Sequence, residues 1–424
     1  MAKFTGTANQ GLTGATLGFF IGFAAVSLYG PTATLIKEQI QLSPILIGLL
    51  VAAPNLSGSL LRIPFSAWVD TTGGRKPMLI LLILSIIGMA GLSYLLSTKA
   101  DQLNGHFLEL LVYGVLSGCG IATFSVGISQ TSYWFPMKRQ GSALATYAGI
   151  GNLAPGIFAF LIPLVALPLL GLSGAYIAWL IFLTLGTIGY FFLGKNAWYF
   201  QAKDQGTPEN VAIREATAMG QEIFPKGRLI DSLKTSGNKR ATWILVSIYF
   251  TTFGGFLALT GWLPNYWMSY FGLPMKVAGG LTATYSILAS LVRIYGGSLA
   301  DKHGGETTLF YSLLILLIGS FIVTISSAIT GAIVGVLLMG IGMGVGNAAV
   351  FKLVPKAAPD AIGGAAGWVG GLGAFGGFVI PLVLALFLTE GIQNDKGYGT
   401  GFSLFIILAL LSMMAVKLFE SKKV

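Results

Sequence analysis

Long apolar stretches recur along the whole chain and constrain its fold more than any other feature of the sequence. A helix that crosses the hydrocarbon core of a bilayer needs about 20 mostly apolar residues. Twelve such stretches cover residues 12–36, 45–69, 77–97, 107–135, 140–163, 172–194, 241–268, 277–300, 307–329, 331–351, 362–389 and 399–419. We therefore predict an all-α membrane protein with 12 transmembrane helices.

The composition argues against a soluble protein. Charged residues make up 9% of the chain, against about 25% in a typical soluble domain. Glycine accounts for 59 of the 424 residues, about twice its usual share, which is typical of closely packed membrane helices. The net charge of +10 lies in the segments between the apolar stretches, so it indicates membrane topology and not nucleic-acid binding.

One polar segment divides the apolar stretches into two sets of six. Residues 195–240 hold eight Lys or Arg and five Asp or Glu. We expect a cytoplasmic linker there, between an N-terminal six-helix half, 1–194, and a C-terminal six-helix half, 241–424. With the N-terminus inside, the cytoplasmic side carries nineteen basic residues and the outer side four. Because basic residues accumulate on the cytoplasmic side, we predict a multi-pass protein of the cell (inner) membrane with both termini cytoplasmic.

The two predicted halves repeat one another at a fixed offset. Residues 61–74 read LRIPFSAWVDTTGG, and residues 292–305 read VRIYGGSLADKHGG. Arg62 thereby aligns with Arg293, at an offset of 231 positions. Self-similarity at a single offset indicates an internal duplication.

Two six-helix halves of this kind resemble the architecture of the major facilitator superfamily. The loop GGSLADKHGG after the eighth apolar stretch is similar to the loop motif of that superfamily. The resemblance implies that three residues in the two copies of this loop act as gate residues at the cytoplasmic side, namely Asp70, Arg75 and Asp301.

Arg62 and Arg293 are the two basic residues that lie deep inside apolar stretches, each about eight residues from the cytoplasmic end. At 1.5 Å per residue this depth is about 12 Å, near the middle of a core about 30 Å thick. The sequence places no Asp or Glu in the middle of any stretch to pair with them. A buried cation at this depth marks a substrate or ion pathway, so we predict that an anion binds between the two arginines.

The guanidinium group favours a particular kind of anion. Its planar fork of donors meets a flat oxyanion in two parallel hydrogen bonds, whereas a lysine would offer a compact point charge. Two central arginines without a central lysine therefore favour a flat, delocalised oxyanion over a spherical halide. One monovalent anion leaves the site near +1, so charge alone leaves sulfate and oxalate open.

Further motifs are similar to those of the nitrate/nitrite porter family, the NarK-type transporters. They are the Gly-rich stretches GSALATYAGIGNLAPG and GGAAGWVGGLGAFGGFVIP, together with YFTTFGGF and GIGMGVGNAAVFKLVP. The resemblance covers nearly the whole chain outside the linker. It implies that the substrate is bound by Arg62, Arg293, Asn152, Tyr249, Phe124 and Phe253. It also implies that helices slide at Gly149, Gly151, Gly371, Gly373, Gly376 and Gly377.

The same resemblance assigns a role to each of these side chains. The two arginines would clamp nitrate, Asn152 and Tyr249 would donate hydrogen bonds to it, and Phe124 and Phe253 would flank its plane. Tyr249 and Phe253 are four residues apart, so they share one face of a helix.

These features predict a secondary transporter that moves nitrate and nitrite by alternating access of its two halves. The sequence places no carboxylate or histidine in the middle of a stretch to carry a proton, which favours nitrate/nitrite antiport. A proton-coupled nitrate symporter, a porter of another small anion such as formate or oxalate, and an anion channel remain alternatives. We expect a monomer in membrane lipid, with no catalytic residue, cofactor, metal or nucleic-acid partner.

Overall fold

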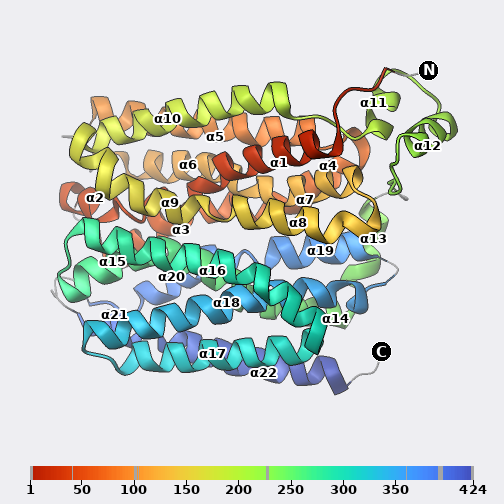
Figure 1. Ribbon diagram of the computed structural model, residues 1–424. Coiled ribbons are helices and arrows are strands. Elements are labelled where there is room, and N and C mark those ends of the chain that lie inside the picture. Colours follow the sequence, from red (N-terminus) through yellow and green to blue (C-terminus); the bar gives the residue numbers. More distant parts are fainter. Residues whose placement is uncertain are drawn as a thin grey trace.

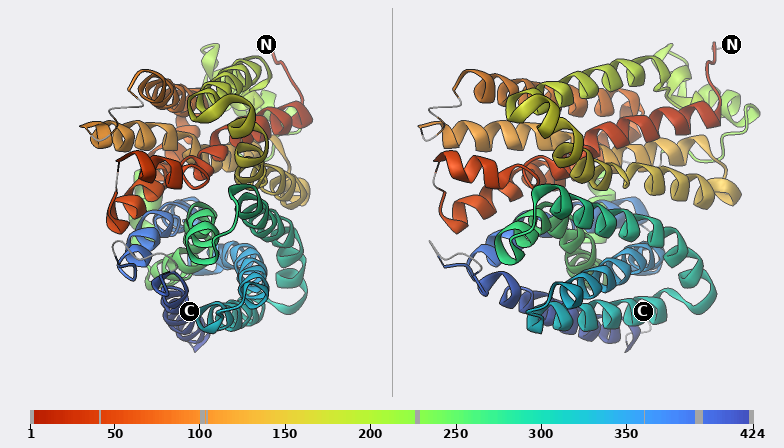
Figure 2. Two further views of the ribbon diagram at one scale, coloured as in Figure 1. Left: turned by 90° about the vertical axis from the view of Figure 1, so that its left-hand side faces the viewer. Right: turned by 60° about the vertical axis from the view of Figure 1, so that its left-hand side comes forward.

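The computed structural model describes residues 3–40, 42–99, 103, 105–225, 229–359, 361–389 and 395–421. Every regular element within these ranges is a helix, which confirms the predicted all-α class. The helices form two bundles that lie one above the other in Figure 1, with a linker at one end. Figure 2 shows the same two bundles from two further directions, the first in red to yellow and the second in green to blue.

The elements divide along the chain into a first bundle, a linker and a second bundle. The first bundle contains α1 (Ala8–Phe23), η1 (Ala24–Ser27), α2 (Ala33–Ile40), α3 (Pro44–Leu60), α4 (Arg62–Thr72), α5 (Arg75–Thr98), α6 (Phe107–Gly118), η3 (Cys119–Ala122), α7 (Thr123–Trp134), α8 (Met137–Gly151), α9 (Ala154–Leu161), η4 (Ile162–Ala166) and α10 (Leu167–Leu193). The linker contains α11 (Trp198–Asp204), α12 (Glu209–Ala218) and α13 (Leu229–Gly237). The second bundle contains α14 (Arg240–Tyr249), η5 (Phe250–Gly254), α15 (Gly255–Phe271), α16 (Met275–His303), α17 (Gly305–Ile325), α18 (Ile329–Ala357), α19 (Ile362–Leu372), α20 (Gly376–Ala385), α21 (Gly397–Thr400) and α22 (Ser403–Ser421).

Eleven helical runs in the described part of the chain are long and apolar enough to cross a membrane. The sequence predicts twelve, and the difference arises because most of the stretches 140–163 and 172–194 falls within one run, Thr146–Leu193, of 48 residues. At 1.5 Å per residue such a run is about 72 Å long, more than twice the thickness of a hydrocarbon core. Gly171, at φ 65° and ψ −176°, interrupts it, and α10 runs back in the direction opposite to α8 and α9 (Figure 1).

The repeated motif ends in similar backbone geometry in both bundles. Gly73 ends α4 at φ 73°, and Gly304 ends α16 at φ 88°. Glycine enters this left-handed region without a steric cost, because it has no Cβ. The two aligned glycines therefore end both copies of the repeat and lead the chain into α5 and α17.

Apolar side chains cover the outside of the bundles as well as the interior. Large apolar side chains of α10, α17 and α22 are at least half exposed, among them Leu169, Leu185, Tyr311, Phe321 and Met414. Such a surface is unfavourable in water, because apolar area is best removed from it, and it suits contact with lipid tails. The surface therefore agrees with the membrane location that the apolar stretches predict.

The linker attaches to both bundles and does not form a separate body. Trp198 of α11 packs edge-on against Trp134 of α7, with 5.0 Å between the ring centres. The last linker helix, α13, instead contacts the second bundle, where the backbone N–H of Gly364 donates to Ser232 Oγ at 3.0 Å. The linker, the start of α1 and the end of α22 all lie at the same end of the molecule (Figure 1).

Glycine brings neighbouring helices of the first bundle into close contact. A Cβ at Gly118 of α6 would lie 2.0 Å from the carbonyl oxygen of Pro54 in α3. A Cβ at Gly88 of α5 would lie 2.3 Å from the backbone nitrogen of Ser117. Membrane helices use small residues in this way to let their backbones approach, so side chains cannot be added at these positions without moving a helix.

We expect Gly118→Ala to destabilise the protein, because the new methyl group would overlap the Pro54 carbonyl and overpacking typically costs about 1–3 kcal/mol. The matched control is Gly280→Ala in α16, where a Cβ would meet no atom within 4 Å. Thermal unfolding of the two purified variants measures the difference. Equal unfolding temperatures would contradict the close contact between α3 and α6.

Candidate anion-binding site

Arg62 stands at the first position of α4, directly after the turn at Leu61, and is completely buried. Its Nε donates to the carbonyl oxygen of Gly58 at 3.0 Å, one turn earlier in the first bundle. One terminal nitrogen donates across to the second bundle, to the carbonyl oxygen of Gly370 in α19, at 3.1 Å. The other terminal nitrogen, NH2, is buried and has no partner among the described residues, so this guanidinium retains donors for a ligand.

Arg293 approaches the same region from α16 of the second bundle. Its NH2 lies 3.5 Å from the hydroxyl oxygen of Tyr249. Within the described ranges, neither Arg62 nor Arg293 has a carboxylate at salt-bridge distance. The described site therefore contains two cations that no acidic side chain neutralises.

Two phenylalanine rings connect the arginines. The Cζ atom of Arg62 lies 4.9 Å from the ring centre of Phe124 and 5.0 Å from that of Phe253. The corresponding distances for Arg293 are 5.6 Å and 5.5 Å. The two rings, one from each bundle, stack on each other at 5.8 Å and 28°. Ring faces attract cations by about 0.5–2 kcal/mol, which holds the guanidiniums in place but leaves their charge unbalanced.

Tyr249 and Phe253 lie at a change in the winding of the helix that carries them. Residues Phe250–Gly254 form a π-helical segment, η5, between α14 and α15. The Tyr249 and Phe253 rings stack at 4.9 Å and 10°, which confirms the prediction that they share one face. Short π segments inside α-helices are frequent at functional sites, and this one directs both rings at the arginines.

Asn152 lies at the break between α8 and α9 and is buried. Its Nδ2 donates to the carbonyl oxygen of Ala148 at 2.7 Å, while its Oδ1 has no partner among the described residues. A side-chain amide carries two N–H donors, so one remains for a ligand. The backbone carbonyl of Asn152 accepts a hydrogen bond at 2.9 Å from Ser290 of the second bundle.

The six glycines predicted to permit sliding all lie where a Cβ would meet a neighbouring residue at 3.0 Å or less. At Gly149 and Gly371 that neighbour is a side chain of the opposite bundle, Ile294 and Ile63 respectively. Gly151, Gly373 and Gly376 pack within their own bundle, and Gly377 packs both on Leu257 of its own bundle and on Asn55 of the first. Sliding itself is a motion and stays a prediction.

The predicted gate residues make contacts within their own bundles. Asp70 accepts a hydrogen bond from Tyr133 at 2.6 Å, and Arg75 donates to the carbonyl oxygen of Phe191 at 2.8 Å. Asp301 pairs with Lys352. The role of Asp70, Arg75 and Asp301 as a gate therefore stays a prediction.

Sequence reasoning missed two contacts between the bundles and one buried polar residue of the second bundle. The first is the Gly370 carbonyl that receives Arg62. The second is Asn55, whose Nδ2 donates across the interface between the bundles to the carbonyl oxygen of Gly377 at 3.3 Å. The third is Asn347 of α18, which is buried and has an Oδ1 without a partner among the described residues. A lone Asn inside an apolar stretch is the signal that could have identified the latter two.

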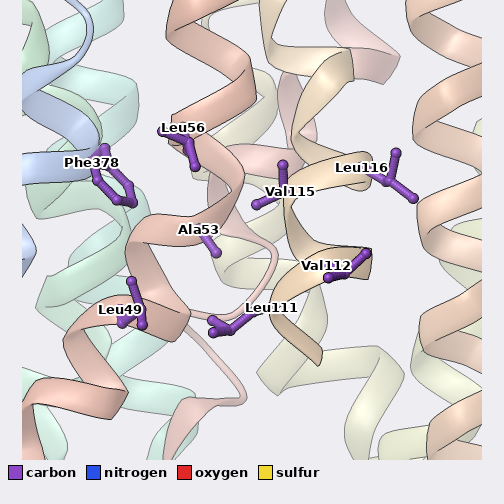
Figure 3. Close-up of a pocket in the computed structure, with 8 residues that line it drawn as sticks. All are labelled: Leu49, Ala53, Leu56, Leu111, Val112, Val115, Leu116 and Phe378. Carbon is purple, nitrogen blue, oxygen red and sulfur yellow. The ribbon is translucent and has the colours of Figure 1, made fainter. Parts of the chain in front are cut away.

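An apolar cavity lies apart from the arginines. It has a volume of about 380 Å³ and is lined by Leu49, Ala53, Leu56, Leu111, Val112, Val115, Leu116 and Phe378 (Figure 3). These side chains offer no hydrogen-bond donor. This cavity is therefore unsuited to an anion, which needs donors or positive charge.

The fold and this site together define a class of protein, namely membrane transporters built from two helical bundles around a central site. The family model described as the Major Facilitator Superfamily matches residues 15–381. The chain belongs to this superfamily. Its fold is shared by the xylose transporter XylE from E. coli, with a TM-score of 0.69 and 15% sequence identity over 96% of this chain and 98% of that one.

Two sequence relatives bear on the particular kind of transporter. A probable nitrate/nitrite antiporter, NarK1 of Thermus thermophilus, is 32% identical over 72% of this chain, and the alignment spans 64% of that relative. A probable nitrate transporter, NarT of Staphylococcus epidermidis, is 29% identical over 95% of each chain. These relatives confirm the resemblance to the nitrate/nitrite porters. They are transporters and not enzymes.

We expect Arg62→Lys to lose more than about 90% of nitrate transport although it keeps the charge. A lysine ammonium cannot reproduce the fork that reaches Gly58 and Gly370 and still presents free donors. Nitrate uptake into proteoliposomes measures the loss, with Arg214→Lys on the exposed face of linker helix α12 as the matched control. Uptake near the wild-type rate would show that the fork geometry is unimportant.

We expect Tyr249→Phe to raise the KM for nitrate by about three- to tenfold, because one net hydrogen bond is worth about 0.5–1.5 kcal/mol. The control is Tyr285→Phe, a second buried tyrosine of the same bundle, whose hydroxyl faces Met343 Sδ at 3.2 Å. Initial uptake rates at varied nitrate concentration give both KM values. If the KM for nitrate is unchanged in Tyr249→Phe, the Tyr249 hydroxyl does not donate a hydrogen bond to the substrate.

Proposed function

We propose that this protein is a secondary transporter that exchanges nitrate for nitrite across the plasma membrane. The observation that carries the proposal is the pair Arg62 and Arg293, one from each bundle, facing the same two phenylalanine rings without a described carboxylate partner. A small flat oxyanion between the rings and the forks would supply the missing negative charge. The relatives named as nitrate/nitrite antiporter and nitrate transporter support this choice of anion.

The proposed mechanism is alternating access, in which the halves 1–194 and 241–424 rock about the site. The proposal includes twelve membrane crossings, with Thr146–Leu193 counted as two, and cytoplasmic termini and linker 195–240. Bringing two like charges to about 7 Å at an effective dielectric constant of about 20 costs about 2.4 kcal/mol. A bound anion reverses the sign of this interaction, so the halves would close more readily around cargo than around an empty site.

Exchange is proposed over proton symport because of the groups that surround the arginines. Proton-coupled carriers use a titratable carboxylate or histidine inside the membrane. The polar partners described around Arg62 and Arg293 are backbone carbonyls and a tyrosine hydroxyl. Arginine itself does not deprotonate in proteins, so the site offers no evident proton carrier.

Counterflow in proteoliposomes tests the proposal. We expect vesicles loaded with nitrite to take up labelled nitrate faster than empty vesicles, and we expect a pH gradient alone to drive no uptake into anion-free vesicles. Vesicles containing Arg293→Gln, which lacks one of the two cations, serve as the control for leakage. Uptake driven by the pH gradient would instead identify a symporter, and the absence of trans-stimulation would identify a channel.

A further inference from the structure

The last linker helix, α13, is bonded to one particular helix of the second bundle. The indole N–H of Trp368 in α19 donates to the carbonyl oxygen of Leu233 at 3.0 Å. One turn earlier in α19, the backbone N–H of Gly364 donates to Ser232 Oγ at 3.0 Å. A Cβ at Gly364 would lie 2.3 Å from the Ser232 carbonyl oxygen, so the two helix backbones are in close contact. In Figure 1, α13 lies next to the N-terminal end of α19, where Gly364 and Trp368 are found.

The same helix supplies the acceptor for the buried arginine. Gly370, whose carbonyl accepts the hydrogen bond from Arg62 at 3.1 Å, is two residues beyond Trp368. It lies in the last turn of α19, which ends at Leu372, and the last four carbonyls of a helix have no partner within that helix. Gly371 packs directly on Ile63, the neighbour of Arg62. The position of α19 therefore decides whether Arg62 reaches this free carbonyl.

The Gly370 carbonyl and an anion would use the same donor. Buried N–H groups of a guanidinium need acceptors, and Gly370 provides one from the opposite bundle to NH1 of Arg62. An anion bound by both terminal nitrogens would compete with this carbonyl for NH1, whereas NH2 has no partner among the described residues. Any contact that holds α19 against α4 therefore favours the carbonyl in this competition and weakens anion binding.

We propose that linker helix α13 is a positioning element of the anion site. Through Trp368 and Ser232 it holds α19 so that the Gly370 carbonyl accepts the hydrogen bond from NH1 of Arg62. When the hydrogen bonds between α13 and α19 break, NH1 of Arg62 becomes available to the anion. The linker therefore sets the affinity of the anion site although no linker residue contacts the anion. The inference rests on the proposed function only in taking Arg62 as an anion ligand.

Trp368→Phe tests the inference, because it removes the indole N–H bond to α13 and keeps an aromatic ring. The matched control is Trp198→Phe in linker helix α11, where the indole N–H has no partner among the described residues, so the same substitution removes no hydrogen bond. Binding of nitrate to the purified protein is measured by calorimetry. We expect the Kd to fall about three- to tenfold in Trp368→Phe, as for one lost hydrogen bond, and to stay unchanged in Trp198→Phe.

Hydrogen–deuterium exchange without any anion provides a second readout. We expect Trp368→Phe to raise exchange in α19 and in α4, and Trp198→Phe to leave both unchanged. Ser232→Ala, which removes the acceptor of the Gly364 N–H, should act in the same direction as Trp368→Phe and serves if that variant folds poorly. If exchange in α4 is unchanged in Trp368→Phe, the inference is overturned. If exchange in α4 rises in Trp368→Phe but the wild type does not bind nitrate, the positioning role of α13 is supported and only the proposed function is contradicted.

Discussion

The burial of the Arg62 guanidinium beside the half-buried Arg293, with no acidic partner for either among the described residues, is the constraint on which the rest of this structure depends. Removing a charge from water is costly unless other groups solvate it. Arg62 meets this cost in part with two backbone carbonyls and two aromatic faces. Carbonyl dipoles and ring faces orient a cation but add no negative charge. The site therefore remains strongly positive, and a small anion is the ligand that it is best suited to hold.

The helices that carry the candidate site residues are interrupted at or next to those residues. Arg62 follows a turn between α3 and α4, Asn152 follows the end of α8, and Phe253 lies in a π-helical segment. A regular helix uses all its central N–H and C=O groups internally, whereas each interruption releases some of them. Such groups are tolerated at membrane depth only where protein covers them or a water-filled cavity takes them up. The irregularities thus supply polarity without added charged side chains.

The interface between the bundles combines close backbone contacts with a few hydrogen bonds in which at most one partner carries a charge. Thr34, Asn55, Arg62 and Ser290 each donate across it, and Gly149 and Gly371 let helices of the opposite bundles touch. Bonds of this kind are worth about 0.5–1.5 kcal/mol net, or about 1.5–3 kcal/mol when a charged group takes part. The interface can therefore hold one arrangement and still be rearranged by the binding energy of a small ligand.

The sequence by itself determined the helical membrane class, the duplication and the two central arginines. A bilayer span requires about 20 apolar residues in succession, and an Arg within such a run stands out whatever surrounds it. The local spacing also placed Tyr249 and Phe253 on one face. Only the tertiary structure decided that Gly171 interrupts the helix between the stretches 140–163 and 172–194, that Gly370 accepts the Arg62 bond, and that α13 docks on α19. Every residue carries a backbone carbonyl, so side-chain patterns cannot reveal which carbonyl accepts the hydrogen bond from Arg62. The packing of segments that are distant in the sequence selects it.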